Sequence, residues 1–493
     1  MSNRIELSVL EDYLWDAAVL LRTNIDAGSY KQYIFPLLFF KRLCDVYDEE
    51  CAQVLLENDG DEEALEWEEN HIFVIPKGSH WNDVRGVAEN VGLAIIAAFR
   101  NIEKANGDKL QGVFGDAAWS NKNRLPDRLL KELIEHFSSQ TLSLKNCPED
   151  ELGQGYEYLI KKFADDSGHT AQEFYTNRTV VHLMTKILKP MSEESIYDPT
   201  CGSAGMLISS VVSLQDQGLE WRNVAIYGQE INSLTSAIAK MNLFLHGIKD
   251  FKIVNGDTLK APAFVQNGKL QTFNVVLANP PYSINQWDRI AFMKDKYGRN
   301  FLGTPNQNRA DYAFIQHILK SLDPENGRCA ILLPHGILNR LEEKNIREKM
   351  IRADLVECVI GIGKNLFYNS PMEACILICR SKKDTLRRGQ VLFINAKQFV
   401  TKVGTESYLT KEQIDDVCKL YDAYKTVEGL TNLATIADIE KQNFSLGISL
   451  YVDNGMNEDI TSTEECIEEW IEASNKVKES HTALIDTFMK GVE

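Results

Sequence analysis

Between about residues 170 and 380, short apolar runs rich in β-branched residues alternate with helix-forming stretches. This alternation is typical of βαβ units, in which successive strands are parallel and the connecting helices cover one sheet. It therefore predicts an α/β fold with a doubly wound sheet. The expected strands are Ser195–Asp198, Val224–Gln229, Phe251–Asn255, Phe273–Ala278, Arg328–Leu333, Leu355–Ile362 and Ala374–Arg380, with helices such as Asn232–Leu245 and Ile337–Met350 between them.

The regions on either side of this alternation favour helices. Apolar residues at helical spacing predict an N-terminal all-helical domain over residues 1–165, followed by an α/β domain over 166–430. A C-terminal helical segment is expected over 431–493, where Thr463–Lys490 combines a rough apolar stripe with many acidic residues. This helix either folds back on its own core or docks on another subunit. The polar, irregular stretch Asp288–Arg309 is a candidate substrate loop.

The net charge of −18 is concentrated in two segments. Residues 41–80 carry a net charge of −9 and residues 451–493 a net charge of −8, so the rest of the chain is close to neutral. Phosphate affinity comes mainly from Lys and Arg, so this balance argues against strong nucleic-acid binding through bulk positive charge. The neutral centre can still face DNA, and the acidic segments are either solvated surface or contacts for basic partners.

The chain contains no apolar run that approaches the roughly 18 residues of a membrane helix, and it opens without a signal-peptide pattern. Its ten cysteines are scattered, without a Cys-x-x-Cys pair or a His spacing that would close a zinc site. We therefore expect a soluble, cytoplasmic protein with buried thiols and no metal.

The first expected strand ends in the turn Asp198-Pro199-Thr200-Cys201-Gly202-Ser203-Ala204-Gly205, which opens a helix. Small residues let the backbone approach a ligand closely, and a helix N-terminus offers free N–H groups. A tight strand-to-helix turn also uses Gly for structural reasons, so this motif alone is weak evidence for a ligand.

Carboxylates also follow the second and third strands, at Glu230 and Asp257. Glu230 lies about 30 residues after the first strand, where a nucleotide-type ligand would present its ribose hydroxyls. Asp257 could accept a hydrogen bond from an adenine amine. Each acid taken alone is as readily a loop cap or a surface group, but Asp198, Glu230 and Asp257 at successive strand ends favour a ligand site there.

The most informative motif is Asn279-Pro280-Pro281-Tyr282, which follows the fourth apolar strand. Two prolines restrict the backbone, so the turn presents the Asn279 side chain and the Pro280 carbonyl rigidly. This pair of acceptors suits a planar NH2 group such as adenine N6. Accepting both N–H bonds favours a more tetrahedral nitrogen, whose lone pair can attack a methyl sulfonium by positioning and electrostatic stabilisation. Tyr282 offers a face on which an extruded base can stack.

These two loops resemble the cofactor loop and the catalytic loop of S-adenosylmethionine-dependent DNA adenine-N6 methyltransferases. The chain is similar to the modification (M) subunit of type I restriction-modification systems over roughly 450 residues, including Leu14-Trp15, Tyr30–Arg42, Gly155–Ile160 and Gln172–Arg178. The resemblance implies a Rossmann-like methyltransferase domain with an N-terminal helical domain and a C-terminal helical tail. The implied cofactor is S-adenosyl-L-methionine.

The resemblance also assigns roles to individual residues. The segment Glu173, Phe174, Tyr175, Thr176, Asn177 and Arg178 would wrap the methionine end of the cofactor, Gly202, Ser203, Ala204 and Gly205 would contact it, and Glu230 would hold its ribose. Asn279, Pro280 and Tyr282 would be catalytic. The family usually has Pro in place of Asn177 and often Gly in place of Ala204. Phe367 is either a second wall for the flipped base or, with better odds, part of the core.

The implied partners are double-stranded DNA, a specificity (S) subunit that reads the target, a second M subunit and a restriction (R) subunit. Two alternatives remain open from the residues. A glutamine amide is also a planar NH2, so the chain could methylate protein glutamine, although such enzymes generally lack this N-terminal domain. A non-catalytic scaffold in a DNA-bound complex is the other alternative.

Overall fold

Residues 4–166 form a helical region around one apolar core. The computed structural model describes residues 4–166, 176–364, 366, 373–403, 406–453, 470 and 474. Predicted features outside these residues are Glu173–Tyr175, Phe367 and nearly all of the helix expected at Thr463–Lys490. The helices of the first region are α1 (Leu7–Leu21), α2 (Lys31–Glu57), α3 (Trp81–Arg85), α4 (Val91–Ala105), α5 (Asp127–Ser138) and α6 (Glu149–Asp166).

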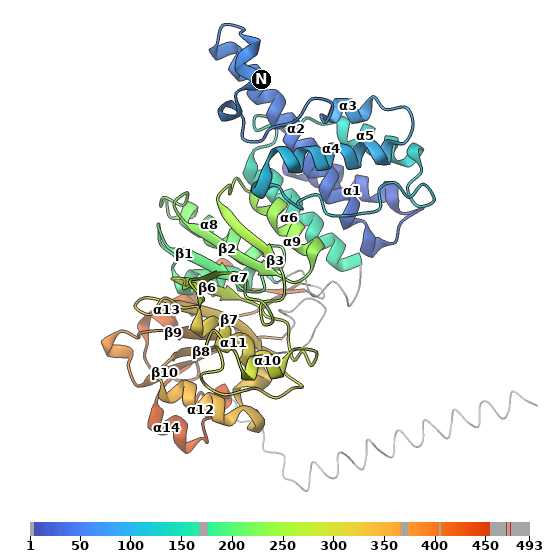
Figure 1. The fold of residues 1–493 in the computed structure, drawn as a ribbon. Coiled ribbons are helices and arrows are strands. Elements are labelled where there is room, and N and C mark those ends of the chain that lie inside the picture. Colours follow the sequence, from blue (N-terminus) through green and yellow to red (C-terminus); the bar gives the residue numbers. More distant parts are fainter. Residues whose placement is uncertain are drawn as a thin grey trace, which may run out of the picture.

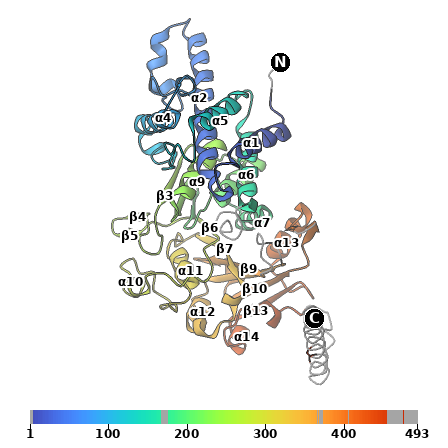
Figure 2. The same ribbon diagram turned by 90° about the vertical axis from the view of Figure 1, so that its right-hand side faces the viewer.

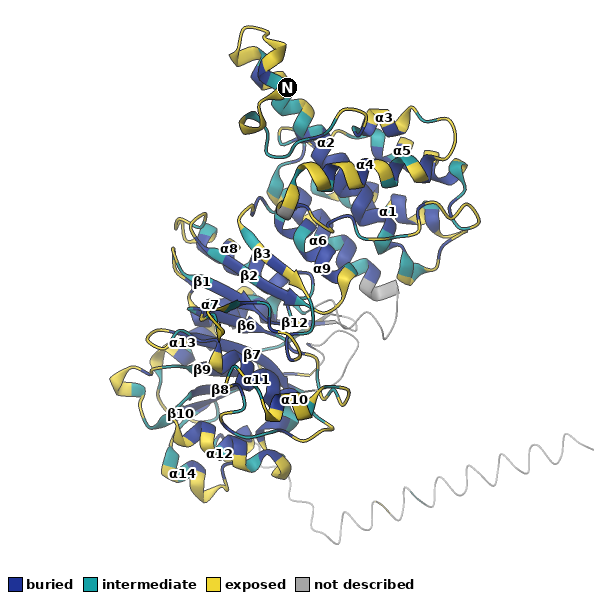
Figure 3. Ribbon diagram, viewed as in Figure 1, coloured by how far each residue is buried: buried dark blue, intermediate teal, exposed yellow. Residues whose placement is uncertain are grey.

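The C-terminal part of α2 projects beyond this helical core (Figure 1). Two short 3₁₀ helices, Glu62–Glu66 and Glu68–Asn70, follow it. Figure 3 shows that this projection is largely exposed, whereas the inner helices and the sheet are buried. Most acidic residues of the first acidic segment, from Glu57 to Glu69, therefore lie on an arm that points away from the sheet.

A nine-stranded sheet forms the second region, in the order β13-β10-β8-β9-β7-β6-β1-β2-β3. Five adjacent strands, β7, β6, β1, β2 and β3, are mutually parallel. β9 runs antiparallel to both of its neighbours, β7 and β8. The strands of this sheet are β1 (Ser195–Asp198), β2 (Ala225–Glu230), β3 (Phe251–Asn255), β6 (Val275–Ala278), β7 (Arg328–Pro334), β8 (Val356–Ile362), β9 (Ala374–Arg380), β10 (Gln390–Ala396) and β13 (Thr431–Thr435). Two hairpins lie outside it, β4 (Val265–Gln266) with β5 (Lys269–Leu270) and β11 (Thr401–Val403) with β12 (Glu406–Tyr408).

Helices cover both faces of the sheet, because successive strand residues point to opposite sides. Ile196 of β1 packs into one apolar core and Tyr197 into the other. Figure 2 shows α7 and α13 on one side and α10 and α11 on the other. The first core includes α7 (Arg178–Leu188), α8 (Gly205–Asp216), α9 (Ser233–Leu245) and α13 (Lys411–Ala423), and the opposite side carries α10 (Arg289–Met293), α11 (Asp311–Lys320), α12 (Lys344–Arg352) and α14 (Ile436–Lys441).

Helix α9 joins the two regions. Ala239 and Leu243 pack against the sheet, whereas Ile238 and Met241 belong to the core of the helical region. The hydroxyl of Tyr156 in α6 donates to the Ile238 carbonyl at 3.4 Å. In Figure 1, α6 and α9 lie side by side at this junction. A helix with two apolar faces thus connects the helical region to the sheet, as expected for a helix buried on both sides.

The α/β prediction is confirmed, and the seven expected strands all form, although some bounds shift by one or two residues. Three local predictions were wrong. The helix expected at Ile337–Met350 begins only at Lys344, after two 3₁₀ turns at His335–Leu338 and Leu341–Glu343. β10 was not among the expected strands, and the strand signal was expected to stop after about residue 430, whereas β13 adds a further strand at the edge of the sheet. β13 is an antiparallel edge strand with polar residues, so it lacks the continuous apolar run of a central strand.

Other expectations concern cysteines and membranes. In the described part of the chain no helix is long and apolar enough to cross a bilayer. The described cysteines are unpaired, and all of them except Cys51 are buried.

Candidate active site

The predicted site residues gather where the sheet reverses its strand order. Strands β1, β2 and β3 follow one another toward one edge of the sheet. The chain then crosses back, and β6 pairs with the opposite side of β1. In open α/β sheets, ligands bind at the carboxyl ends of strands beside such a switch point. The loop after β1 begins at Asp198 and the loop after β6 begins at Asn279, so both predicted motifs flank it.

The loop after β1 is a tight turn that leads into α8. Gly202 has φ +53° and Ala204 has φ +66°, and α8 starts at Gly205. The left-handed conformation costs a residue with a Cβ roughly 1–2 kcal/mol, which gives a reason for the glycine common at the Ala204 position in the resembling family. Asn242 of α9 supports the turn from below by donating to the Ser203 carbonyl at 2.8 Å.

Glu230, the last residue of β2, is bound to this turn. Its Oε2 accepts the Gly202 N–H at 3.0 Å, and its Oε1 accepts the Asn232 N–H at 2.8 Å. A carboxylate oxygen can accept more than one hydrogen bond, so this orientation is compatible with two ribose hydroxyls. The structure thus brings Glu230 and Gly202 together as the sequence predicted.

The loop after β3 lies next to the loop after β1 and contributes Asp257 to the site. Asp257 Oδ1 accepts the Leu259 N–H at 2.9 Å and the Lys260 N–H at 3.1 Å, so this carboxylate caps a turn. The Thr258 hydroxyl donates to the Pro199 carbonyl at 2.6 Å, which ties this loop to the loop after β1. Thr258 was missed by sequence reasoning, because nothing in the local pattern shows that its hydroxyl reaches a residue far away in the chain.

The insertion Asp288–Arg309, predicted as a substrate loop, is hydrogen-bonded to the loop after β3. It contains α10, and the buried Arg299 donates to the carbonyls of Thr258 at 2.9 Å and Leu259 at 2.8 Å. Arg299 also pairs with Asp295 at 2.7 Å. The insertion is therefore connected to the strand-end loops through backbone carbonyls.

Asp198 is almost completely buried, with 2 % of its surface exposed. Burial, and after it the charge of Glu230, raises the pKa of Asp198 to about 8, although the Thr200 N–H at 2.9 Å opposes this shift. Two neighbouring carboxylates in a buried site favour a ligand that carries positive charge, since such a ligand stabilises the ionised form of both.

Asn279 lies in the loop after β6, and both ends of its side-chain amide are hydrogen-bonded. Its Nδ2 donates to the Thr176 hydroxyl at 3.0 Å, and its Oδ1 accepts the Tyr282 hydroxyl at 2.7 Å. Burial raises the pKa of Tyr282 well above its usual value, so the phenol is a donor at neutral pH. Sequence reasoning proposed Tyr282 as a stacking surface and missed its hydroxyl, which contacts the same oxygen that is expected to accept a target amine.

The segment expected to wrap the methionine end of the cofactor leads into α7, which begins at Arg178. Asn177 caps α7 by accepting the Thr179 N–H at 3.0 Å, and its Nδ2 donates to the Ser407 carbonyl at 2.9 Å. Proline, the usual residue at this position in the resembling family, could make neither bond. The described part of the segment, residues 176–178, thus reaches both the catalytic loop and β12.

Arg178 connects this segment to the glycine turn. Its guanidinium pairs with Glu157 of α6 at 2.7 Å. A Cβ on Gly205 would lie 1.7 Å from Arg178 Nη1, so the first residue of α8 must lack a side chain for the guanidinium to occupy this place. The structure therefore brings together the predicted residues Arg178 and Gly205.

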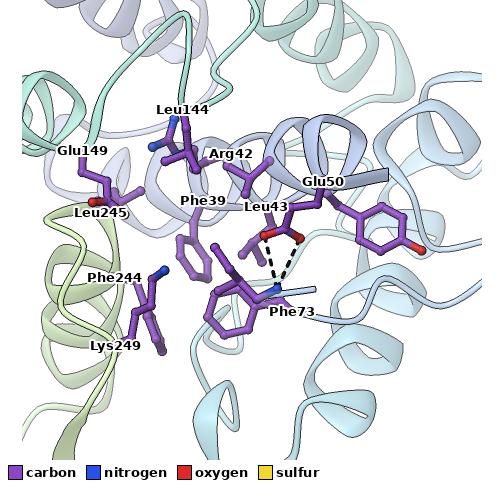
Figure 4. A pocket seen from close by; sticks show the side chains of 13 residues that line it. Phe39, Arg42, Leu43, Glu50, Phe73, Leu144, Glu149, Phe244, Leu245 and Lys249 are labelled. Carbon is purple, nitrogen blue, oxygen red and sulfur yellow. Dashed lines mark hydrogen bonds between the residues drawn. The ribbon is translucent and has the colours of Figure 1, made fainter. Parts of the chain in front are cut away.

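A separate pocket lies between α2 and the C-terminal end of α9 (Figure 4). Phe39, Phe73 and Phe244 supply apolar walls, and Glu50 accepts the Ile72 N–H at 3.2 Å. None of the predicted site residues lines it. This pocket belongs to the junction between the helical region and the sheet, and it is distinct from the switch point.

Comparisons with known proteins find both family models and relatives that resemble this chain. The family model for N-6 DNA Methylase matches residues 148–459, and the HsdM N-terminal domain matches residues 10–137. The type I restriction enzyme MjaVIII methylase subunit of Methanocaldococcus jannaschii is 32% identical, covering 91% of this chain and 79% of that protein. The HindI methylase subunit of Haemophilus influenzae is also 32% identical, covering 76% of this chain and 85% of that protein.

A solved structure shows the same fold over nearly the whole chain. The type I restriction-modification methyltransferase subunit from Streptococcus thermophilus superimposes with a TM-score of 0.78 at 27% identity, covering 91% of this chain and 100% of that one. The similarity includes both the helical region and the sheet, so it extends well beyond a shared loop motif.

Proposed function

Since the chain belongs to the N-6 DNA methylase family, as the modification subunit of a type I restriction-modification system, we propose that the switch-point loops form its active site. The enzyme transfers a methyl group from S-adenosyl-L-methionine to adenine N6 in DNA. The observation that carries the assignment of this site is the Asn279 amide, held between Thr176 and Tyr282 at the end of β6.

The proposed cofactor site is made by the loops after β1, β2 and β3 together with the segment 173–178. Glu230 would bind the ribose, Asp257 the adenine amine, and the turn Gly202-Ser203-Ala204-Gly205 would pass close to the cofactor backbone. Asp198 and the segment 173–178 would surround the methionine end. The donor set fits, because the buried carboxyl of Asp198 next to Glu230 suits the ammonium and sulfonium charges, and the left-handed turn keeps side chains away from the ligand.

The proposed chemistry requires positioning by the protein's own residues. S-adenosylmethionine supplies an electrophilic methyl group on sulfur. Asn279 Oδ1 and the Pro280 carbonyl accept the two N–H bonds of adenine N6, which localises its lone pair for in-line attack. Tyr282 donates to Asn279 Oδ1 and keeps the amide in register. In this role the hydroxyl of Tyr282 acts together with the ring face predicted to stack on the extruded base.

One assay tests the substrate class. The chain, with and without a co-expressed specificity subunit, is incubated with labelled cofactor and either duplex DNA or a protein with a methylatable glutamine. We expect label on adenine N6 in DNA. Label on protein glutamine alone would support the alternative enzyme, and no label with either substrate in the complete complex would support the scaffold.

We also propose the assembly and its place in the cell. Residues 1–165 would form the helical domain, 166–430 the catalytic domain, and 431–493 a segment for subunit docking, although β13 and α14 of this last segment pack with the sheet. The partners would be double-stranded DNA, a specificity subunit, a second M subunit and a restriction subunit. We propose a cytoplasmic location because the substrate of this activity is DNA.

Binding of the cofactor is expected to release a proton near pH 7. Asp198 is mostly protonated there, because burial raises its pKa to about 8. A cationic ligand favours the carboxylate, so the proton leaves and affinity rises as the pH increases from about 6 toward 8. Calorimetry in two buffers of different ionisation enthalpy measures the release.

Asp198→Asn is the matched variant for this experiment, because it keeps the shape of the side chain and cannot ionise. It should remove the proton release and flatten the pH dependence of affinity. Proton release of the same size in Asp198→Asn would assign the titration to another group and contradict the prediction.

A further inference from the structure

The residue directly after the catalytic tetrapeptide has a backbone conformation that needs support. Ser283 has φ +51°, in the left-handed region that residues with a Cβ rarely adopt. Such conformations persist at functional sites when surrounding contacts impose them. The contacts that impose this one come from two distant parts of the chain.

Asp311, the first residue of α11, binds the Ser283 backbone. Its side chain is fully buried, and its Oδ1 accepts the Ser283 N–H at 2.9 Å. Its Oδ2 accepts Arg340 Nη1 at 2.8 Å. Arg340 Nη2 also lies 3.4 Å from the Ser283 hydroxyl, to which it donates. The three residues therefore form a closed ring around the end of the catalytic loop.

Arg340 is itself held in place by Arg347 of α12. The buried Arg347 donates from Nη1 to the Arg340 carbonyl at 2.8 Å and from Nε to the Phe444 carbonyl at 3.0 Å. These two bonds link the backbone of Arg340 to α12 and to the chain at Phe444. The ring around Ser283 is thus connected to the helical layer below the sheet.

Glu343 gives Arg340 a second acidic neighbour. It is 1 % exposed, its Oε2 lies 3.7 Å from Arg340 Nη1, and within the described residues neither of its carboxylate oxygens accepts a hydrogen bond. Burial raises the pKa of Glu343 to about 7. The guanidinium therefore lies between Asp311, which it contacts directly, and a carboxyl that it only approaches.

The catalytic loop has little freedom between its two ends. At the start, β6 is buried at every residue, from Val275 to Ala278. Pro280 and Pro281 have a restricted φ. The position of Asn279 is therefore determined by β6 on one side and by the attachment of Ser283 on the other.

We infer that Asp311 and Arg340 are positioning residues for methyl transfer, which hold Asn279 in register by fixing Ser283 at the far end of its loop. This inference rests on the proposed function of Asn279. Both residues act through Ser283, Asp311 on its backbone N–H and Arg340 on its hydroxyl and on Asp311. A small displacement of a catalytic group can lower a rate by up to about 10²-fold, so loss of either residue should reduce kcat much more than binding.

The test uses Asp311→Asn and Arg340→Gln in the complete methyltransferase complex. We expect kcat to fall by about 10- to 100-fold, while KM for DNA and the cofactor Kd stay within about 3-fold. Arg340→Lys keeps the charge but cannot bridge Asp311 and Ser283 together, so it should be intermediate. Arg352→Gln removes an arginine of α12 that pairs with Glu348 and Glu440 at the surface, and should leave kcat unchanged.

Several outcomes would overturn the inference. One is a kcat within about 2-fold of the wild type in both Asp311→Asn and Arg340→Gln. Another is a loss of kcat matched by an equal loss of cofactor affinity, which would indicate general disruption of the fold. A fall of the same size in Arg352→Gln would contradict it too. If Asn279→Ala is fully active, the proposed function fails first, so the two failures are distinguishable.

Discussion

Replacement of Asn279 by alanine is expected to lower the rate of DNA methylation by about 10²- to 10³-fold or more, the range seen when a preorganised polar contact to a transition state is removed. The amide oxygen of Asn279 is the acceptor proposed for adenine N6, and the Tyr282 hydroxyl donates to it at 2.7 Å, while the amide nitrogen donates to the Thr176 hydroxyl at 3.0 Å. Alanine removes this acceptor and both supporting bonds. Transfer of labelled methyl groups to a duplex that contains the target measures the effect.

The cofactor should still bind to Asn279→Ala, because the proposed contacts from the loops after β1, β2 and β3 remain and the segment 173–178 loses only the bond from Asn279 to Thr176. Asn123→Ala is a suitable control, since Asn123 is exposed in the helical region, far along the chain from the catalytic loop. Activity of Asn279→Ala within 10-fold of the wild type would show that another group accepts the target amine. Equal losses in both variants would point to a defect of folding.

The purified chain without a specificity subunit is expected to methylate DNA at least about 100-fold more slowly than the complete complex. Phosphate affinity depends on neutralisation by Lys and Arg, and this chain has a net charge of −18. Most acidic residues of its first acidic segment, from Glu57 to Glu69, lie on the arm at the end of α2, away from the switch point. The near-neutral centre can face DNA but cannot bind it strongly. Initial rates at one salt concentration, with and without the partner, measure the difference.

Cofactor binding is the internal control for this second prediction. The proposed cofactor site lies within one chain, so the Kd for S-adenosylmethionine should change little when the partner is added. Robust, sequence-specific methylation by the isolated chain would contradict the expectation that target reading is delegated. A large gain in cofactor affinity on assembly would instead show that the partner completes the cofactor site.

The α/β architecture was predictable from the chain because its signals are local. Apolar runs such as Val275–Ala278 are buried on both faces, and they are recognisable from a few consecutive residues. The signal was lost where an element is short or polar. The edge strand β13 is only partly buried, and the 3₁₀ turns before α12 share the composition of a helix start.

The sequence predicted the motifs of the site, but it did not predict the hydrogen bonds between them. The sequence indicated that Asp198, Glu230 and Asn279 follow strands, and the switch point brings these strand ends together. It did not indicate that Tyr282 donates to Asn279, that Thr258 reaches Pro199, or that Asp311 holds Ser283. Such polar contacts leave no periodic pattern, because any of these residue types is also common on a surface.

The sequence by itself determined the order of the strands along the chain, the rigid acceptor pair at Asn279 and Pro280, and the separation of the acidic charge from the catalytic region. These properties depend on neighbouring residues, through backbone restriction, periodic burial and composition. The tertiary structure alone decided the burial of Asp198, the ring around Ser283 and the contact of Thr176 with Asn279, which are 103 positions apart. Hydrogen bonding and desolvation depend on which groups meet in space, and only the crossing of the chain at the sheet brings these groups together.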